Sequence, residues 1–168
     1  MDVIIRDAFP TDAIAICDIY NHYVLNTIIT FEESPISLIE MVDRINEVQE
    51  KFPWIVAQHN DDVIGFAYAS SWKSRCAYKY SVESTVYLEY DRTGKGLGTA
   101  LYSKLLEQIK LLNLHAVIGG IALPNPGSVA LHEKFGFKNV AQFEQVGYKF
   151  NTWIDVGYWE LILDDISE

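Results

Sequence analysis

Cysteine is scarce in this chain of 168 residues, which contains only Cys17 and Cys76. Two cysteines this far apart match no metal-ligand spacing, and they cannot form the dense disulfide framework of a small secreted domain. Cys17 lies in an apolar helical pattern, so we expect it to be a small core residue. The cysteine content thus gives no reason to expect a metal site or a disulfide, and it suits a reducing compartment.

Basic residues and long apolar segments are also lacking. Thirteen Lys and Arg residues stand against 23 Asp and Glu, which gives a net charge of −10. This balance argues against a nucleic acid or an anionic membrane as the main partner. No apolar run approaches membrane-spanning length, and the N-terminus lacks the basic start and apolar segment of a signal peptide. We therefore expect a cytoplasmic protein.

The composition is otherwise that of a soluble globular protein, with 49% hydrophobic and 21% charged residues. The length fits one domain with a substantial core. We find no internal repeat, low-complexity segment or linker, so we expect a single domain over residues 1–168.

Residues 83–137 organise the chain. They contain an apolar run, a Gly-rich turn, an amphipathic helix, a second apolar run and a short helix opened by Pro126. Periodicity and capping signals predict further elements on both sides. The expected strands cover residues 3–6, 54–57, 63–69, 85–90, 116–122, 140–146 and 153–163, and the expected helices end near residues 23, 49, 112 and 135.

The turn at residues 93–98 carries glycine at positions 94, 96 and 98. Its backbone N–H groups are unshielded by side chains, and it joins a strand to a helix, so it favours a bound phosphate. The spacing is wrong for a dinucleotide-binding motif, and a nucleotide-hydrolysing loop would need Gly-Lys-Ser/Thr where Thr99 and Ala100 follow. A purely structural turn stays possible, although three alternating glycines exceed what a turn requires.

A cluster of cations and aromatics occupies residues 70–81, which have no clean periodicity. Lys73, Arg75 and Lys79 are interleaved there with Trp72 and Tyr78. Such a segment is usually a solvated loop, but in an acidic protein it also fits the rim of a pocket for an anionic group. Composition does not decide between the two interpretations.

Several motifs together resemble the GNAT N-acetyltransferase superfamily, and more narrowly its phosphinothricin and methionine sulfoximine N-acetyltransferases. The superfamily pattern Gln/Arg-x-x-Gly-x-Gly/Ala is matched by residues 93–98, except that Thr93 takes the place of Gln or Arg while Arg92 precedes it. The narrower resemblance extends over nearly the whole chain. It rests on residues 20–23 (YNHY), 68–69 (YA), 72–75 (WKSR), 83–87 (ESTVY), 123–125 (LPN), 131–133 (LHE), 146–149 (VGYK) and 153–157 (WIDVG).

The resemblance implies an α/β (α+β) fold, with a mixed, mostly antiparallel sheet of about six or seven strands and about four helices. It also implies acetyl-CoA as co-substrate and no metal. The backbone of the strand before the turn would pair with the pantetheine arm, and the turn would hold the pyrophosphate. The implied cofactor residues are Val86, Tyr87, Leu88, Thr93, Gly94, Lys95, Gly96, Leu97, Gly98, Thr99, Asn125 and Ser128.

The resemblance assigns catalysis to two residues. Glu83 would take a proton from the ammonium of the substrate, which must be deprotonated before it attacks. Many members of the superfamily place a tyrosine seven residues after the Asn of the last strand–helix turn, and here that residue is His132. A histidine can protonate the departing CoA thiolate near neutral pH. The substrate residues would be Phe31, Lys73, Arg75, Tyr78, Ser84 and Thr85.

The sequence therefore predicts direct acetyl transfer to the α-amine of a small amino-acid-like substrate, in a protein that we expect to be a homodimer. Two alternatives stay open. The acidic charge also suits a polyamine or a protein N-terminus as acceptor, and a CoA-binding sensor without catalysis would share the Gly-rich turn. Lys149 and Trp153 belong either near the active site or at a dimer contact, and the sequence does not separate these.

Overall fold

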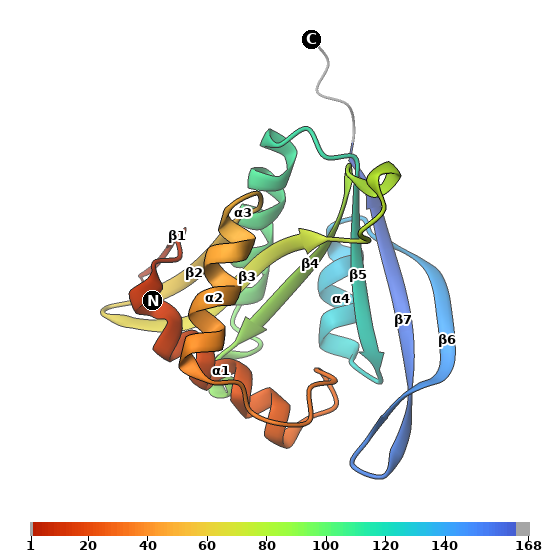
Figure 1. Ribbon diagram of the computed structural model, residues 1–168, viewed down its shortest axis with the longest axis horizontal. Helices are drawn as coiled ribbons and strands as arrows, with labels where there is room; N and C mark the ends of the chain where they lie inside the picture. The colour runs from red at the N-terminus through yellow and green to blue at the C-terminus, as the bar shows by residue number, and fades with distance from the viewer. Residues whose placement is uncertain (1, 164–168) are drawn as a thin grey trace.

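A seven-stranded sheet with two helices on each face forms the protein in this computed structural model, which describes residues 2–163 (Figure 1). The strand order is β1-β2-β3-β4-β5-β7-β6, and within the described residues every pair except β4–β5 is antiparallel. The predicted fold class is therefore confirmed. The elements are β1 (Val3–Asp7), α1 (Ala13–Asn26), α2 (Leu38–Gln49), β2 (Trp54–His59), β3 (Asp62–Ser71), β4 (Ser81–Leu88), α3 (Leu97–Leu111), β5 (Ala116–Leu123), α4 (Pro126–Lys134), β6 (Lys138–Lys149) and β7 (Thr152–Ile162), with 3-10 turns η1 (Pro10–Asp12), η2 (Cys76–Tyr78) and η3 (Tyr90–Arg92).

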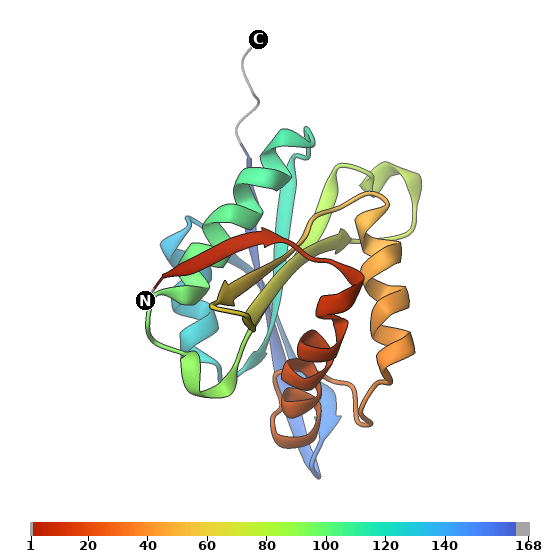
Figure 2. The same cartoon turned by 90° about the vertical axis from the view of Figure 1, so that its left-hand side faces the viewer.

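Two apolar cores hold the helices to the sheet, one on each face. Figure 2 shows α1 and α2 on one side of the sheet and α3 and α4 on the other. The α3 side buries Leu101, Leu105 and Ile109, as their helical spacing predicted. Leu112 was expected to join them but is exposed, because α3 ends at Leu111. The α1 and α2 side buries a second set that includes Ile16 and Ile45.

Strand β4 begins earlier than its sequence pattern indicated. The apolar alternation predicted a strand over residues 85–90, but β4 runs from Ser81 to Leu88, and Tyr90 lies exposed in η3. Polar residues extend the strand because they pair with β3, where Glu83 lies opposite Ser70. Glu83 is therefore a strand residue and not part of a preceding loop.

The central feature of the sheet is a fork between β4 and β5. These parallel strands pair only at Ser81 with Ala116, Val82 with Val117 and Glu83 with Ile118. Beyond this point β4 continues along β3 and β5 continues along β7, so the two strands diverge (Figure 1). Past Glu83 and Ile118, the facing backbone groups of β4 and β5 no longer pair with each other, and the fork opens there.

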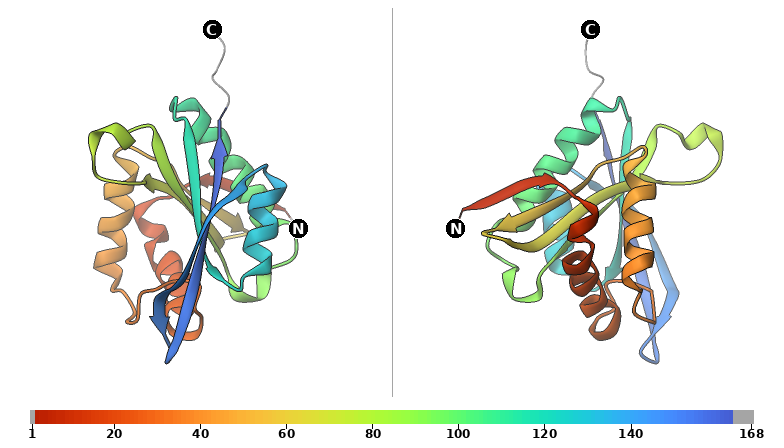
Figure 3. Two further views of the ribbon diagram at one scale, coloured as in Figure 1. Left: turned by 90° about the vertical axis from the view of Figure 1, so that its right-hand side faces the viewer. Right: turned by 60° about the vertical axis from the view of Figure 1, so that its left-hand side comes forward.

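The hairpin of β6 and β7 completes the sheet at its far edge, where Figure 3 shows it beside the fork. Its two-residue turn has Phe150 and Asn151 at φ 52° and 58°, the left-handed conformation that tight hairpins require. A second irregularity lies within β6, where the register with β7 shifts between Phe143 and Gly147 and Gln145 has φ 55°. In the part of the chain that the structure describes, no helix is long and apolar enough to cross a membrane.

Candidate active site

A cavity of about 340 Å³ occupies the fork. The diverging strands supply its floor, helix α4 one wall, and residues of the segment between α1 and α2 another. The fork thus creates a site between elements that are distant in the sequence. The lining residues include Ile29, Thr30, Phe31, Glu83, Ser84, Thr85, Gly120, Asn125, Ser128, His132, Val146 and Tyr158.

Glu83 lies at the apex of the fork, at the last paired position of β4. Its carboxylate faces Gly120 of β5, where an added Cβ would meet Glu83 Oε1 at 3.3 Å and Tyr158 Cε1 at 3.1 Å. Burial raises the pKa of Glu83 above that of an ordinary glutamate, and the charge of Lys73 partly opposes this. A half-buried carboxylate of raised pKa is suited to accept a proton.

His132 enters the same cavity from the opposite face of the sheet and is only 4% exposed. Its Nδ1 lies 2.7 Å from the backbone oxygen of Ser128, and because this oxygen can only accept, Nδ1 carries the proton. Nε2 has no hydrogen-bond partner among the described residues, and an added Cβ on Gly119 would lie 2.3 Å from it.

Burial lowers the pKa of His132, although its hydrogen bond to Ser128 partly opposes this. The ring is therefore neutral near pH 7, with an unprotonated Nε2. In this state Nε2 can accept a proton, and the sequence-based prediction that His132 protonates the CoA thiolate requires that Nε2 first take one up. Adjacent residues of β5, Gly119 and Gly120, thus face the two predicted catalytic side chains on opposite sides of the sheet.

Ser84 and Thr85 both line the cavity, but their side chains point to opposite faces of β4, as successive strand residues do. Ser84 shares a hydrogen bond of 2.6 Å with Tyr102 of α3, whose ring contacts His132 edge to face at 5.1 Å between centroids. Ser84 therefore supports the His132 side of the site. Thr85 lies on the Glu83 side, opposite Tyr68 of β3.

A second cavity, of about 540 Å³, adjoins the first and shares Ile29, Val86, Tyr87, Asn125 and Ser128 with it. It runs from the fork to the Gly-rich turn, where Gly94 and Gly96 adopt φ values of 76° and 79°. The first N–H groups of α3, from Leu97, have no acceptor within the helix, and a helix start of this kind is suited to an anion. The predicted cofactor residues that line this groove are Val86, Tyr87, Leu88, Thr93, Gly94, Gly96, Gly98, Thr99, Asn125 and Ser128.

Charged residues near the turn divide between its two sides. Arg92 pairs with Glu89 and Asp91 and lies outside the groove, so Thr93 is the residue that faces the groove at this point. Lys95 also lies outside, with Nζ 3.4 Å from the backbone oxygen of Asp91.

The cation that does line the groove is Lys134 of α4, whose Nζ is 3.4 Å from Thr99 Oγ1. Sequence reasoning missed it, because nothing in the motif around residues 131–133 signals that the end of α4 meets the start of α3. A single lysine on a short helix carries no periodic signal of such a contact.

Only some of the predicted substrate residues line the cavity at the fork. Phe31 lines the cavity at the fork, whereas Lys73, Arg75 and Tyr78 are exposed on the segment between β3 and β4 and do not line it. Tyr158 does line it, and sequence reasoning missed this residue because β7 reads as an ordinary apolar strand. Among residues 2–163 no group of three His, Cys, Asp or Glu side chains is placed to hold a metal ion.

In this sheet β4 and β5 diverge, Glu83 lies at the apex, and the helix that follows β4 begins with free N–H groups suited to an anion. This is the architecture expected of an acyl-CoA-dependent acyltransferase. Residues 5–157 match the family model described as acetyltransferase (GNAT) domain. The chain belongs to the GNAT acetyltransferase family, and the predicted enzyme class, an N-acetyltransferase, is confirmed.

Known relatives match the chain over most of their length. The phosphinothricin N-acetyltransferase of Streptomyces viridochromogenes is 40% identical over 156 residues, which cover 93% of this chain and 85% of that protein. The L-methionine sulfoximine/L-methionine sulfone acetyltransferase of Salmonella typhimurium is 35% identical over 165 residues, covering 96% and 95%. The crystal structure of a phosphinothricin acetyltransferase from Sinorhizobium meliloti in complex with acetyl-CoA has a TM-score of 0.94, with 36% identity and coverage of 97% and 89%.

Proposed function

We propose that this N-acetyltransferase transfers the acetyl group of acetyl-CoA to the α-amine of a small amino-acid-like substrate of the phosphinothricin, methionine sulfoximine or methionine sulfone type. The observation that carries the proposal is the position of Glu83, a carboxylate of raised pKa at the apex of a fork that continues into an anion-binding groove. The named activities of the two relatives support this substrate class.

Acetyl-CoA fits the groove by its charges and its hydrogen-bonding groups. The pyrophosphate belongs at the N-terminus of α3, where unpaired N–H groups and Lys134 attract anions. The free edge of β4 at residues 86–88 offers backbone groups to the amides of the pantetheine arm. Held in this way, the thioester reaches the fork between Glu83 and His132, and backbone N–H groups of the open strands are available to its oxyanion.

The two predicted catalytic residues then act on different protons. Glu83 removes one proton from the substrate ammonium, which frees the nitrogen lone pair to attack the thioester carbon. In the tetrahedral intermediate the nitrogen again carries excess positive charge. His132 accepts this second proton on Nε2 and returns it to the CoA sulfur as the C–S bond breaks. The products are the N-acetylated amine and the CoA thiol, and the first proton leaves Glu83 for solvent, so no covalent enzyme intermediate is needed.

Acceptor choice follows from size and charge. The cavity of about 340 Å³ accommodates a small amino acid, and Phe31 and Tyr158 give it apolar walls. Lys73 is close enough to influence Glu83 electrostatically and favours an acceptor that carries an anionic group.

We also propose that the protein is a homodimer in the cytoplasm. Edge strand β6 and its hairpin expose a row of large apolar side chains, including Phe143, Tyr148 and Trp153, the last of them 60% exposed. An exposed apolar edge of this kind is normally covered by a partner. Cys17 and Cys76 are both free, which suits a reducing compartment. Sedimentation analysis of the wild-type chain tests the dimer.

The test of the activity is a thiol-release assay with acetyl-CoA and a panel of amines, with mass spectrometry of the products. The panel contains phosphinothricin, L-methionine sulfone, L-methionine sulfoximine, the standard amino acids, a polyamine and an N-terminal peptide. We expect efficient N-acetylation of the first three compounds. Preferential acetylation of the polyamine or the peptide would contradict the proposed acceptor class, and absence of thiol release with every amine would contradict the activity.

A further inference from the structure

The segment between α1 and α2, residues 27–37, forms a wall of the acceptor cavity although it contains neither helix nor strand. Ile29, Thr30 and Phe31 line the cavity from this segment, which we call the acceptor loop. A loop without regular backbone pairing keeps its position only if other contacts fix it. Its anchors therefore decide the shape of the acceptor site.

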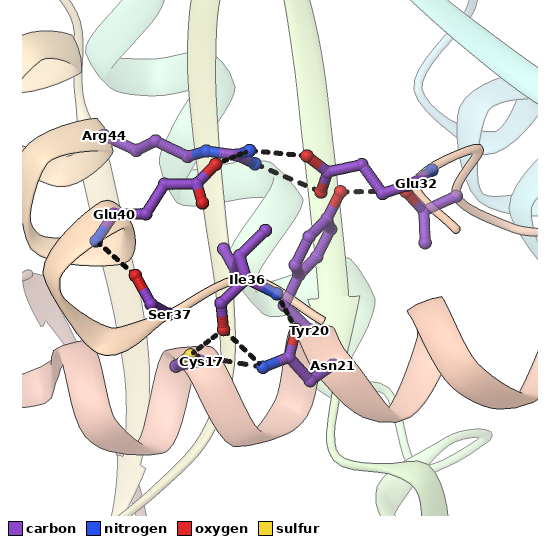
Figure 4. A network of polar contacts seen from close by, with 9 residues as sticks. Cys17, Tyr20, Asn21, Glu32, Ile36, Ser37, Glu40 and Arg44 are labelled. Atoms are coloured by element: carbon purple, nitrogen blue, oxygen red, sulfur yellow. Dashed lines mark hydrogen bonds and ion pairs between the residues drawn. The ribbon is translucent and has the colours of Figure 1, made fainter. Parts of the chain in front are cut away.

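The first set of anchors comes from α1 and α2 and is drawn in Figure 4. The side-chain amide of Asn21 accepts from the backbone N–H of Ile36 and donates to the oxygen of the same residue, both at 2.9 Å. The guanidinium of Arg44 donates to both carboxylate oxygens of Glu32 (Figure 4). Tyr20 shares a hydrogen bond of 2.8 Å with the hydroxyl of Thr30. These contacts hold the loop to the helices but do not connect it with the far side of the fork.

The second anchor comes from β6 and does make this connection. The Nζ of Lys149 donates to the backbone oxygen of Thr30 at 2.8 Å, and Lys149 is only 3% exposed. Burying an ammonium costs free energy that a hydrogen bond offsets only in part. An apolar side chain at this position would therefore cost less free energy than the buried lysine. Burial lowers the pKa of Lys149, while the carboxylates of Glu32 and Glu33 act in the opposite direction.

Phe31 meets the same hairpin at Gly147. An added Cβ on Gly147 would lie 2.4 Å from the Cζ of Phe31, so the ring packs directly on the backbone of β6. Gly147 is not among the glycines with positive φ, and close approach is therefore the reason for glycine at this position. The register of β6 with β7 shifts just before Gly147, and irregularities of this kind bend a strand.

We propose that Lys149 is a positioning residue that sets acceptor specificity: it ties Thr30 of the acceptor loop to β6, and Gly147 gives Phe31 the room to close the cavity. The proposal rests on the proposed amine acetylation. Lys149 is not among the residues that line the cavity, so it acts on the cavity through Thr30 and Phe31. Trp153, which the sequence placed either near the active site or at a dimer contact, is exposed on the surface of the hairpin.

The first test compares Lys149→Met with Lys138→Met, an exposed lysine of the same strand. Loss of a buried, charge-assisted hydrogen bond releases the loop, so the KM for L-methionine sulfone should rise about tenfold or more in Lys149→Met. The KM for acetyl-CoA should change less than about twofold, and acetylation of the bulkier L-tryptophan should fall less than that of the sulfone. Lys138→Met should match the wild type. An equal loss for both amines, or an equal rise in both KM values, would overturn the assignment.

A double-mutant cycle tests the Gly147 part without removing Lys149. Gly147→Ala should displace the Phe31 ring and raise the amine KM by itself, but it should add little to the effect of Phe31→Ala. Fully additive effects in the double variant would show that Gly147 does not act through Phe31, which would overturn this part of the proposal.

Hydrogen exchange of residues 27–37 separates this inference from the proposed function. In Lys149→Met the amides of the acceptor loop should exchange about tenfold or more faster than in Lys138→Met, whether or not the enzyme acetylates any amine in the panel. Unchanged protection of the loop would overturn the tether even if activity fell. If the wild type acetylates no amine of the panel, the proposed function and the specificity role of Lys149 are both overturned. The exchange result would still show whether Lys149 holds the acceptor loop in place.

Discussion

Substituting the two adjacent glycines of β5 separates the two sides of the reaction centre. An added Cβ on Gly119 would lie 2.3 Å from Nε2 and 2.6 Å from Cδ2 of His132, which is buried and has little room to retreat. An added Cβ on Gly120 would meet Tyr158 at 3.1 Å and Glu83 at 3.3 Å on the opposite face, where the site is more open. Gly119→Ala therefore perturbs His132, and Gly120→Ala perturbs the acceptor side.

The geometry sets the size of both effects. In Gly119→Ala the imidazole must move by about 0.7 Å or more before the contact reaches 3.0 Å, a displacement that overpacked cores resist at a cost of about 1–3 kcal/mol. For a domain of this size we expect the melting temperature to fall by about 2–12 °C. Gly120→Ala requires shifts of only a few tenths of an ångström, so its stability should change by less than about 1 kcal/mol.

Steady-state kinetics and thermal unfolding of both variants test this expectation. Below its melting temperature, Gly119→Ala should lose turnover by about tenfold or more at saturating amine, because displaced Nε2 no longer meets the intermediate. Gly120→Ala should mainly raise the KM for the amine. If Gly119→Ala keeps wild-type turnover while its melting temperature falls, the role of His132 in proton transfer is refuted.

Two further predictions concern charge. Lys134→Met should raise the KM for acetyl-CoA by about two- to fivefold and leave the KM for the amine unchanged, because an exposed lysine contributes modestly to phosphate binding. The control is Lys110→Met, at the other end of α3. Equal KM values for acetyl-CoA in the two variants would contradict the groove assignment. Lys73→Met removes a charge that lowers the pKa of Glu83, so the acid limb of kcat/KM should move to higher pH. The shift should be a few tenths of a pH unit, disappear at high salt and be absent in Lys79→Met; a shift to lower pH would contradict Glu83 as the base.

Local signals in the sequence were sufficient for most of the fold. Helical spacing located the buried face of α3. The sequence Ser37-Leu38-Ile39-Glu40 has the pattern of a capping box, which predicts a helix start, and α2 does begin there, with the Ser37 hydroxyl accepting from the backbone N–H of Glu40. The reciprocal half of that capping box does not form, because the carboxylate of Glu40 pairs with Arg44 instead. The ends of strands were less predictable where backbone pairing with a neighbouring strand, and not the side-chain pattern, sets the end. The start of β4 at Ser81 is an example.

Motifs named most of the residues that line the candidate site, but they did not predict its geometry. Glu83, Asn125 and His132 converge because of the fork, and no sequence pattern shows where two parallel strands stop pairing. The protonation state of His132 depends on a backbone oxygen four residues earlier and on burial, which a motif does not encode. The acceptor loop is fixed by Lys149, 119 residues away from Thr30 in the chain, and such a contact has no local signal.

The most direct test of the proposed mechanism is the turnover of Glu83→Gln, measured together with its acetyl-CoA affinity and its unfolding temperature. Because burial raises the pKa of Glu83, the ionised carboxylate costs stability at neutral pH, and this cost disappears as pH falls below its folded-state pKa. The variant should therefore be at least as stable as the wild type at pH 7. We predict that it binds acetyl-CoA with unchanged affinity and turns over about two or more orders of magnitude more slowly. A stable variant with near-normal turnover would contradict the assignment of Glu83 as the base.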